Sequence, residues 1–589
     1  MDGSRTRSFR IWLLPLSILL AVAGALFFVP FLVDAKGDLS KLHLLLEPNA
    51  TAAETVVTNS ADVIAGVLGI AITVVAIIVE LAANRYTHRI AELFVHEPVN
   101  FVVMGYFVVA ALQGFVVGLV FDASGQGSSG FVPYVGVAVS NTMLAVGLLI
   151  LLPYFAFVFD FLNPIHIVDR MRKHTLDVIA KQKGTNAEIQ AEAVRGIEQL
   201  ADVGLNAMEH KDKGVSMASV DALQQMVLDY QAVCRSLPDE WFRVEGELAH
   251  NPDFVSMSDS VHEAVTRRRI WLEMKILRKY QTLYNEALNK MRDINYVVAI
   301  NTRHIATASL ASKHAELFEL SVKFFNTYMR STVNARDVRT AYNVLYQYRL
   351  VAEAALSEDG GRHSVEIARY FKYYGLVAFN ANLPFILETV AYDLCALCEL
   401  AFDRRSPVTR ELLRIFLQVD KESESAAQEV SLRGVRKAQV KLATYYLLHG
   451  DEELARQVYR DMETERRERL ASIRDELLGV TSSEFWEISD RGQNFDYLSP
   501  ERKQKMLLFF SWFADLVSPT VSRLPEELVS SSIPLPVVQG EPLVEAPGLG
   551  RDPGSSEPPP ADVPEPTTEG TAEATEAVVP RARASEPSE

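Results

Sequence analysis

Four long apolar runs in the first 165 residues constrain the fold more than any other feature of the sequence. Charged side chains occur only near the ends of these runs, which cover residues 11–33, 61–83, 99–121 and 131–160. A bilayer core about 30 Å thick requires roughly 20 apolar residues in helical form. A helix also satisfies its own backbone hydrogen bonds in hydrocarbon. The sequence therefore predicts a membrane region over residues 1–165 with four transmembrane helices.

The first apolar run also has features of a secretory signal peptide. Three arginines precede it, and residues 33–35 form an acceptable cleavage site. The run is longer than the roughly 7–15 apolar residues that are usual in a signal peptide. We therefore expect an uncleaved anchor, with a cleaved signal peptide as the alternative.

Lysine and arginine residues flank the runs asymmetrically. One side carries Lys36 and Lys41 only, whereas the other side carries Arg5, Arg7, Arg10, Arg85, Arg89, Arg170, Arg172 and Lys173. Short loops that are rich in these residues stay in the cytosol. The pattern predicts a multi-pass protein of the cell (inner) membrane with both termini in the cytosol, and an outer loop over residues 34–61.

Three polar side chains within the runs are candidate intramembrane sites, namely Glu80, Gln113 and Asn141. An ionisable group in a membrane segment suggests a function. Glu80, however, lies close to the cytosolic end of its run, where a carboxylate reaches water. For Gln113 and Asn141 we expect hydrogen bonds between helices rather than a pore lining.

Residues 166–527 have the pattern of a cytosolic helical domain, built as a stack of hairpins. Apolar residues recur at helical spacing, with proline and glycine between the segments. The clearest segment predicts one long helix over residues 258–309 with a heptad stripe. Its candidate seam residues are Met274, Leu277, Tyr284, Leu288, Met291 and Asn295. The stripe can close a homodimer as a coiled coil, or pack against other helices of the same chain.

Two further patterns occur in this domain. Residues 442–462 resemble one tetratricopeptide hairpin, although no second copy recurs at the 34-residue period of that repeat. Tyr342, Tyr346 and Tyr348 follow one another at helical spacing, and such aromatic residues form either a core or a groove for a peptide or lipid. The fold class is thus all-α, and proline and glutamate in residues 528–589 predict a disordered tail.

No residue pattern predicts catalysis, a metal site or a bound cofactor. Cys395 and Cys398 form a CxxC pair, but matching ligands are absent nearby and the pair lies in an apolar helical run. We interpret them as buried core thiols. The formal net charge of −17 disfavours nucleic acid as a partner, because phosphate backbones repel a negative chain. An enzyme is the least favoured class.

Residues 72–89, which span the end of the second run and its exit, resemble a family of predicted bacterial inner-membrane proteins of unknown function. The similarity is loose and is carried by Leu81-Ala82-Ala83 and by the exit Tyr86-Thr87-His88-Arg89. It implies four N-terminal spans followed by a cytosolic domain. It implies no activity.

Two functions remain open at this point. The first is a membrane-anchored scaffold or signalling adaptor, whose helical domain binds a cytosolic protein. The second is an oligomeric channel or transporter, because four helices form a pore only in a closed homo-oligomer. In either case the lipid bilayer is a partner of the protein.

Overall fold

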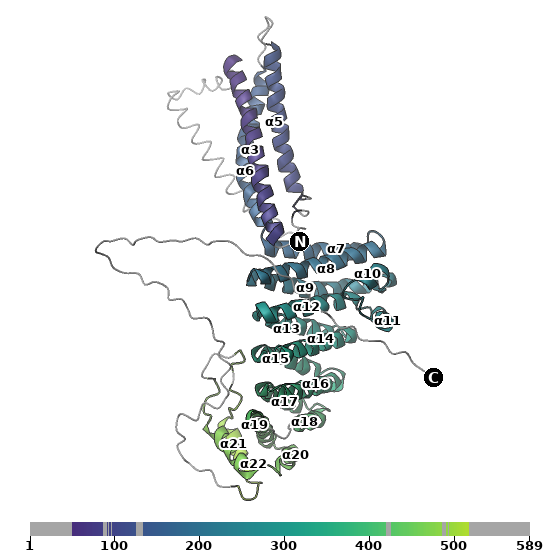
Figure 1. Cartoon of the computed structure of the whole chain (residues 1–589), viewed down its shortest axis with the longest axis vertical. Coiled ribbons are helices and arrows are strands. Elements are labelled where there is room, and N and C mark those ends of the chain that lie inside the picture. The colour runs from purple at the N-terminus through teal and green to yellow at the C-terminus, as the bar shows by residue number, and fades with distance from the viewer. Residues whose placement is uncertain are drawn as a thin grey trace, which may run out of the picture. The chain divides into compact units, whose positions relative to one another are not determined.

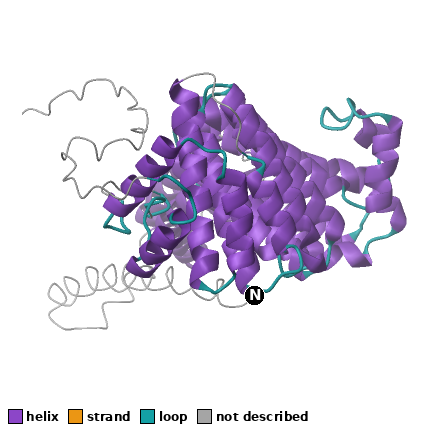
Figure 2. Cartoon of the chain, turned by 90° about the horizontal axis from the view of Figure 1, so that it is seen from below, coloured by secondary structure: helices purple, strands orange, loops and turns teal. Residues whose placement is uncertain are grey.

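The computed structural model describes residues 50–85, 91, 94–95, 97–124, 133–419, 426–485, 490–492 and 494–516. Every regular element within these ranges is a helix (Figure 2). The expected all-α class is therefore confirmed. The first apolar run and the segment 528–589 lie outside the described residues, so their predicted states stay predictions.

Three helices in the described part are long and apolar enough to cross a membrane. They are α3 (Ala50–Arg85), α5 (Pro98–Ser124) and α6 (Tyr134–Phe161), and each contacts the other two. They contain the second, third and fourth expected spans. Helix α3 already begins at Ala50, so the final part of the expected outer loop is helical. Many large apolar side chains on these helices are exposed, as lipid-facing positions require.

The closest approach between α3 and α5 depends on a glycine. A Cβ atom at Gly114 would lie 2.9 Å from the Cβ of Ala61. By contrast, Gly66 and Gly69 of α3 are exposed and have open space around them. Small residues allow membrane helices to pack closely, and here Gly114 supplies that contact.

Replacing Gly114 with alanine is expected to destabilise the membrane helices by about 1–3 kcal/mol, because the added methyl group forces α3 and α5 apart. Gly118 lies one turn further along the same helix, and a Cβ atom there meets nothing within 4 Å. Gly118→Ala should therefore leave stability unchanged or raise it slightly. Thermal unfolding of both full-length variants in detergent tests the contrast, and equal melting temperatures would contradict the close approach.

The remaining helices form a stack of two layers (Figure 1). Within each layer every helix contacts the next. The first layer contains α9 (Lys213–Val233), α13 (Asp293–Ala311), α15 (Val338–Ala355), α17 (Pro384–Asp403) and α19 (Ala426–Leu448). The second layer contains α8 (Asn186–Glu209), α12 (Trp271–Lys290), α14 (Ala315–Asn334), α16 (Arg362–Asn380), α18 (Thr409–Leu417) and α20 (Glu452–Met462). The expected hairpin stack is thus present.

Shorter elements complete the stack. Helix α7 (Pro164–Lys181) packs on α8 and α9, and α22 (Pro500–Phe510) packs on α19. The others are η2 (Cys234–Ser236), η3 (Asp239–Phe242), α10 (Gly246–His250), α11 (Asp259–Arg268), η4 (Asp359–Gly361) and α21 (Arg467–Gly479). One continuous core of buried apolar side chains extends through the stack.

Three turns of the stack share one geometry. The second residue after the end of the helix takes a left-handed conformation, at Lys211, Arg336 and Gly450. In each case an aspartate follows and caps the next helix by accepting a backbone N–H bond. The N–H of that aspartate also bonds to a carbonyl oxygen five residues back, which satisfies the end of the preceding helix. Of these three left-handed residues, only Gly450 is of the type that predicts such a turn from the sequence.

The prediction of a single long helix over residues 258–309 is wrong. The segment contains three helices, α11, α12 and α13. Arg269 ends α11 in a left-handed conformation, and Met291 separates α12 from α13 with φ −153° and ψ 76°. The heptad stripe continues across the breaks because each helix of the stack buries one face, so apolar spacing persists where the backbone turns.

The candidate seam residues are covered by helices of the same chain. Leu277, Tyr284 and Asn295 are fully buried, and Leu288 is 8% exposed. Met274 and Met291 are half-buried and pack against the same core. The amide of Asn295 donates to the carbonyl oxygen of Tyr284 at 2.6 Å, which ties α13 to α12. This stripe therefore presents little free surface to a second chain.

Candidate interaction site

The most unusual polar arrangement in the described residues lies on the outer face of α15, α17 and α19. Described residues of the segment that follows α21 contact this face, and none of residues 490–492 and 494–498 is helical. We call residues 490–498 of this segment the strap, of which residue 493 is not described. Its contacts reach side chains far earlier in the chain, and we call the face that receives them the strap site.

Arg491 of the strap inserts between α15 and α17. Its guanidinium donates to both carboxylate oxygens of Asp393, at 2.6 and 3.3 Å, and to the carbonyl oxygen of Tyr342. The guanidinium carbon lies 4.1 Å from the ring centre of Tyr342 and 5.2 Å from that of Tyr346. The Arg491 and Asp393 side chains are 5% and 2% exposed. A buried carboxylate with two aromatic faces matches the flat, forked arginine head group.

Phe495 and Asp496 of the strap form a second attachment on α17 and α19. The ring of Phe495 stacks on Tyr392, with ring centres 4.6 Å apart and planes 16° apart. The hydroxyl of Tyr392 donates to Asp496 at 2.5 Å, and Lys437 donates to the other carboxylate oxygen at 2.7 Å. Lys441 donates to the carbonyl oxygen of Phe495 at 2.9 Å. The strap site therefore recognises an arginine, an aromatic ring and a carboxylate at once.

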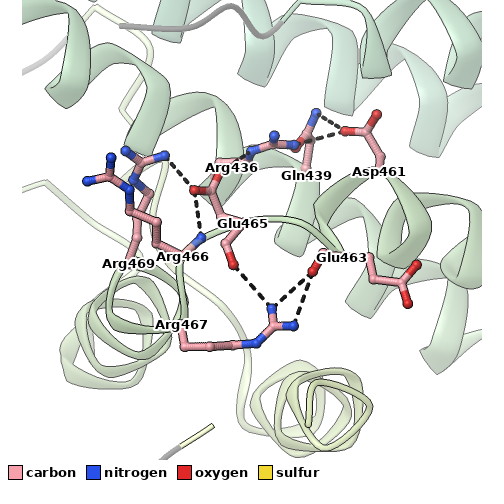
Figure 3. A network of polar contacts seen from close by, with 8 residues as sticks. All are labelled: Arg436, Gln439, Asp461, Glu463, Glu465, Arg466, Arg467 and Arg469. Carbon is pink, nitrogen blue, oxygen red and sulfur yellow. Dashed lines mark hydrogen bonds and ion pairs between the residues drawn. The ribbon is translucent and has the colours of Figure 1, made fainter. Parts of the chain in front are cut away.

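Helix α19 carries a basic face that holds the neighbouring C-terminal elements as well. Arg436 donates to Asp461 at 2.8 Å and to Glu465 at 3.1 Å, and Arg469 reaches the same Glu465 at 2.6 Å (Figure 3). Arg467 donates to the backbone oxygen atoms of Glu463 and Glu465. This network fixes the corner between α20 and α21, and so the direction in which the chain leaves toward the strap.

The aromatic residues expected to form a core or a groove divide between the two roles. Tyr348 is buried and stacks on Phe325 at 4.7 Å, with an interplanar angle of 8°. Tyr342 and Tyr346 are half-buried and contact the strap. Burial raises the pKa of Tyr348 well above its ordinary value, so its phenol stays neutral.

The structure does not bring the three intramembrane candidates together as one site. The hydroxyl of Ser60 on α3 donates to the side-chain oxygen of Asn141 on α6 at 3.1 Å. This contact is a bond between helices, as expected for Asn141. Gln113 is half-buried on α5, and Glu80 is exposed on α3.

Cys395 and Cys398 are buried within α17, as expected for core thiols. Burial raises the pKa of both thiols, which disfavours the thiolate form that metals and disulfide exchange require. Within the described residues, no cluster of three histidine, cysteine, aspartate or glutamate side chains could hold a metal ion.

Glu273 is a buried carboxyl group on α12. It accepts a hydrogen bond from Gln231 at 2.9 Å, while its second oxygen atom has no partner among the described residues. Burial raises its pKa from 4.5 to about 7, and hydrogen bonds from its own backbone and Gln231 partly oppose this. The folded chain therefore holds a proton here at pH values where the unfolded chain has lost it.

The free energy of unfolding is therefore expected to fall as the pH rises from about 4.5 to about 7. Glu273 accounts for a loss of about 3 kcal/mol over this range. Above pH 7 its contribution stays constant. Glu273→Gln should match the parent near pH 4, below the unfolded-state pKa, and exceed it by about 3 kcal/mol near pH 8. Urea unfolding across this pH range measures the difference between the two proteins, and parallel stability curves would exclude the role of Glu273.

Sequence reasoning did not identify Asp393 or Arg491. Asp393 lies mid-helix among apolar residues, but the same helix also contains Glu388 and Glu399, so the charge of Asp393 gave no distinguishing signal. Arg491 stands in a polar segment without periodicity, 98 residues away from its partner. The pairing becomes visible only when the chain is folded.

Comparison with known proteins extends the similarity noted from the sequence. Residues 9–237 match the model of a family described as "Predicted membrane protein (DUF2254)". The match includes the expected spans and continues through α7, α8 and α9, far beyond residues 72–89, which carry the similarity noted from the sequence. No curated protein and no solved structure matches the chain. The protein is thus a helical membrane protein, similar over residues 9–237 to a family of predicted membrane proteins of unknown function.

Proposed function

We propose that this protein is a membrane-anchored scaffold or signalling adaptor of the inner membrane, whose hairpin stack binds a cytosolic protein. The observation that carries the proposal is the strap site. It holds a non-helical stretch of polypeptide through a buried ion pair and stacked aromatic rings, which are the contacts that anchor protein interfaces.

The junction between the membrane helices and the stack supports the cytosolic placement. Phe94, which precedes α5, packs on Phe161 at the end of α6 with ring centres 5.3 Å apart. Arg170 of α7 lies over the same Phe161 ring at 4.2 Å. Asn163 caps α7 directly after α6. Phe94 and the start of the stack thus lie at the same end of the membrane helices, which supports a cytosolic position for the end whose flanks are rich in lysine and arginine.

The alternative, an oligomeric channel or transporter, has less support. Asn141 is engaged by Ser60 within one chain, and a polar group paired in this way contributes to helix packing. Glu80 lies near the end of α3 that leads to the stack, where water is within reach of its side chain.

Chemical crosslinking in membranes, followed by native mass measurement of the full chain in detergent, tests the proposal. A complex with a second polypeptide is expected, with crosslinks on α13, α15 or α17. Lys323 and Lys372 on the opposite layer serve as reference positions. A mass that corresponds to this chain alone, together with ion flux in liposomes, would replace the scaffold with the channel.

A further inference from the structure

We propose that the strap site is a docking site for an extended segment of a cytosolic protein. That segment presents an arginine, an aromatic side chain four residues later, and a carboxylate directly after it. The chain's own strap occupies the site until such a segment displaces it. This inference rests on the proposed scaffold function and specifies the partner of that same site.

The arginine requirement follows from the geometry around Asp393. Its carboxylate is almost fully buried and receives two N–H groups of Arg491. Arg349 also lies 3.4 Å from this carboxylate, but it belongs to α15 and is therefore part of the site that receives the strap. A lysine offers a single ammonium group and cannot bridge both oxygen atoms while also lying flat between Tyr342 and Tyr346.

The second half of the motif follows from Tyr392 and Lys437. The ring of Tyr392 is nearly parallel to that of Phe495, so a planar side chain fits there. The hydroxyl of Tyr392 and the ammonium group of Lys437 each donate to one of the two carboxylate oxygen atoms of Asp496. An amide in place of this carboxylate would lose the charge-assisted bond to Lys437.

The part of the strap before Leu498 can leave without unfolding the helices beneath it. Helices α15, α17 and α19 contact one another directly. Leu498, at the end of the strap, belongs to the buried core and anchors that end, whereas Phe495 is only partly buried against the core. The backbone N–H groups of Asn494 and Tyr497 donate to the carbonyl oxygen atoms of Ser483 and Asn494, so these bonds stay close in sequence. Attachment therefore depends mainly on side chains, and such segments open at lower free energy than core helices.

Tethering sets the strength of the competition. A segment linked to its own site acts at an effective concentration in the millimolar range. A free segment of equal intrinsic affinity therefore binds poorly to the intact chain and well to a chain whose strap has been weakened. The strap makes the scaffold selective, because only a partner that outcompetes it is retained.

The test uses a fluorescent synthetic peptide with the sequence of residues 490–499 and the full-length protein in detergent. The strap is weakened by the double substitution Arg491→Ala/Phe495→Ala. We expect anisotropy to show peptide binding at least about tenfold tighter to this variant than to the parent. Adding Asp393→Asn should abolish the gain. The matched control, Arg460→Ala/Leu507→Ala, alters an exposed arginine and an exposed leucine of α20 and α22 and should behave like the parent.

A measurement on the unaltered chain protects the test against misfolding of the variant. Excess peptide at millimolar concentration should speed hydrogen exchange in residues 490–498 of the parent while exchange in α15 and α17 stays slow. Peptide binding that is absent from the weakened variant, or equal in variant and parent, would overturn the inference. If crosslinking in membranes captures a cytosolic protein equally with the parent and with Asp393→Asn, the scaffold function is kept and this docking site is rejected. Peptide binding to the weakened variant without capture of any cytosolic protein would keep the site but reject the scaffold function.

Discussion

Asp393→Ala is expected to destabilise the hairpin stack by about 3–5 kcal/mol, because it removes the carboxylate from a buried ion pair. The guanidinium groups of Arg491 and Arg349 would then lack their shared partner. Urea unfolding of the full chain in detergent measures the effect. Asp177→Ala provides the control, since its ion pair with Lys181 is exposed and contributes little.

A double-mutant cycle assigns this loss to the strap. If Arg491 and Asp393 act on each other, adding Arg491→Ala to Asp393→Ala should cost less than the sum of the single losses, with a coupling of about 0.5–3 kcal/mol. Additive losses would mean that the strap is not held by this pair, and the strap site would lose its central contact.

Leu288→Asp is expected to destabilise the stack by about 4 kcal/mol or more, because it places a charge among apolar side chains on α12. Leu288 is 8% exposed within one chain. Glu286→Gln, on the neighbouring polar face, should cost no more than about 0.5 kcal/mol through its helix pair with Lys290. Unfolding curves and native mass are measured together. A variant that melts like the parent would mean an exposed stripe, and a folded variant that changes from dimer to monomer would reveal an oligomer seam.

The membrane helices were predictable because hydrocarbon permits few solutions. An uncharged run of sufficient length has to become a helix there, and three of the four expected runs are helices in the described residues. The position of the polar contacts was partly predictable. Asn141 has a partner on another helix, but Ser60, which provides it, gave no distinguishing signal.

The hairpin stack was predictable as a class, whereas its repeat was not. The hairpins that start at Asp293, Val338 and Pro384 recur after about 45 residues, which is longer than the roughly 34 residues of a tetratricopeptide repeat. The turns of the first and third hairpins use Lys313 and Arg405 in the left-handed conformation, where glycine is the usual marker. Arg269 and Met291, which separate α11, α12 and α13, are neither glycine nor proline, so the sequence pattern predicts one helix across them.

The strap site lay beyond sequence reasoning for a different reason. Hydrophobic periodicity reports which face of a helix is buried, and it identified the tyrosines of α15 as candidates. It contains no information on which distant segment supplies the partner. Arg491 and Asp393 become a pair only through the path of the chain from α17 through α19 and α21.

The most direct test of the account is site-specific photo-crosslinking in intact membranes, with a photoreactive residue in place of Arg339. This exposed position of α15 lies one turn before Tyr342. In the otherwise unaltered chain we predict crosslinks to residues 490–498 of the same chain. With Arg491→Ala/Phe495→Ala also present, we predict crosslinks to a second polypeptide that carries the arginine, aromatic and carboxylate motif. Crosslinks to lipid or to this chain alone in both proteins would contradict a scaffold that docks its partner at the strap site.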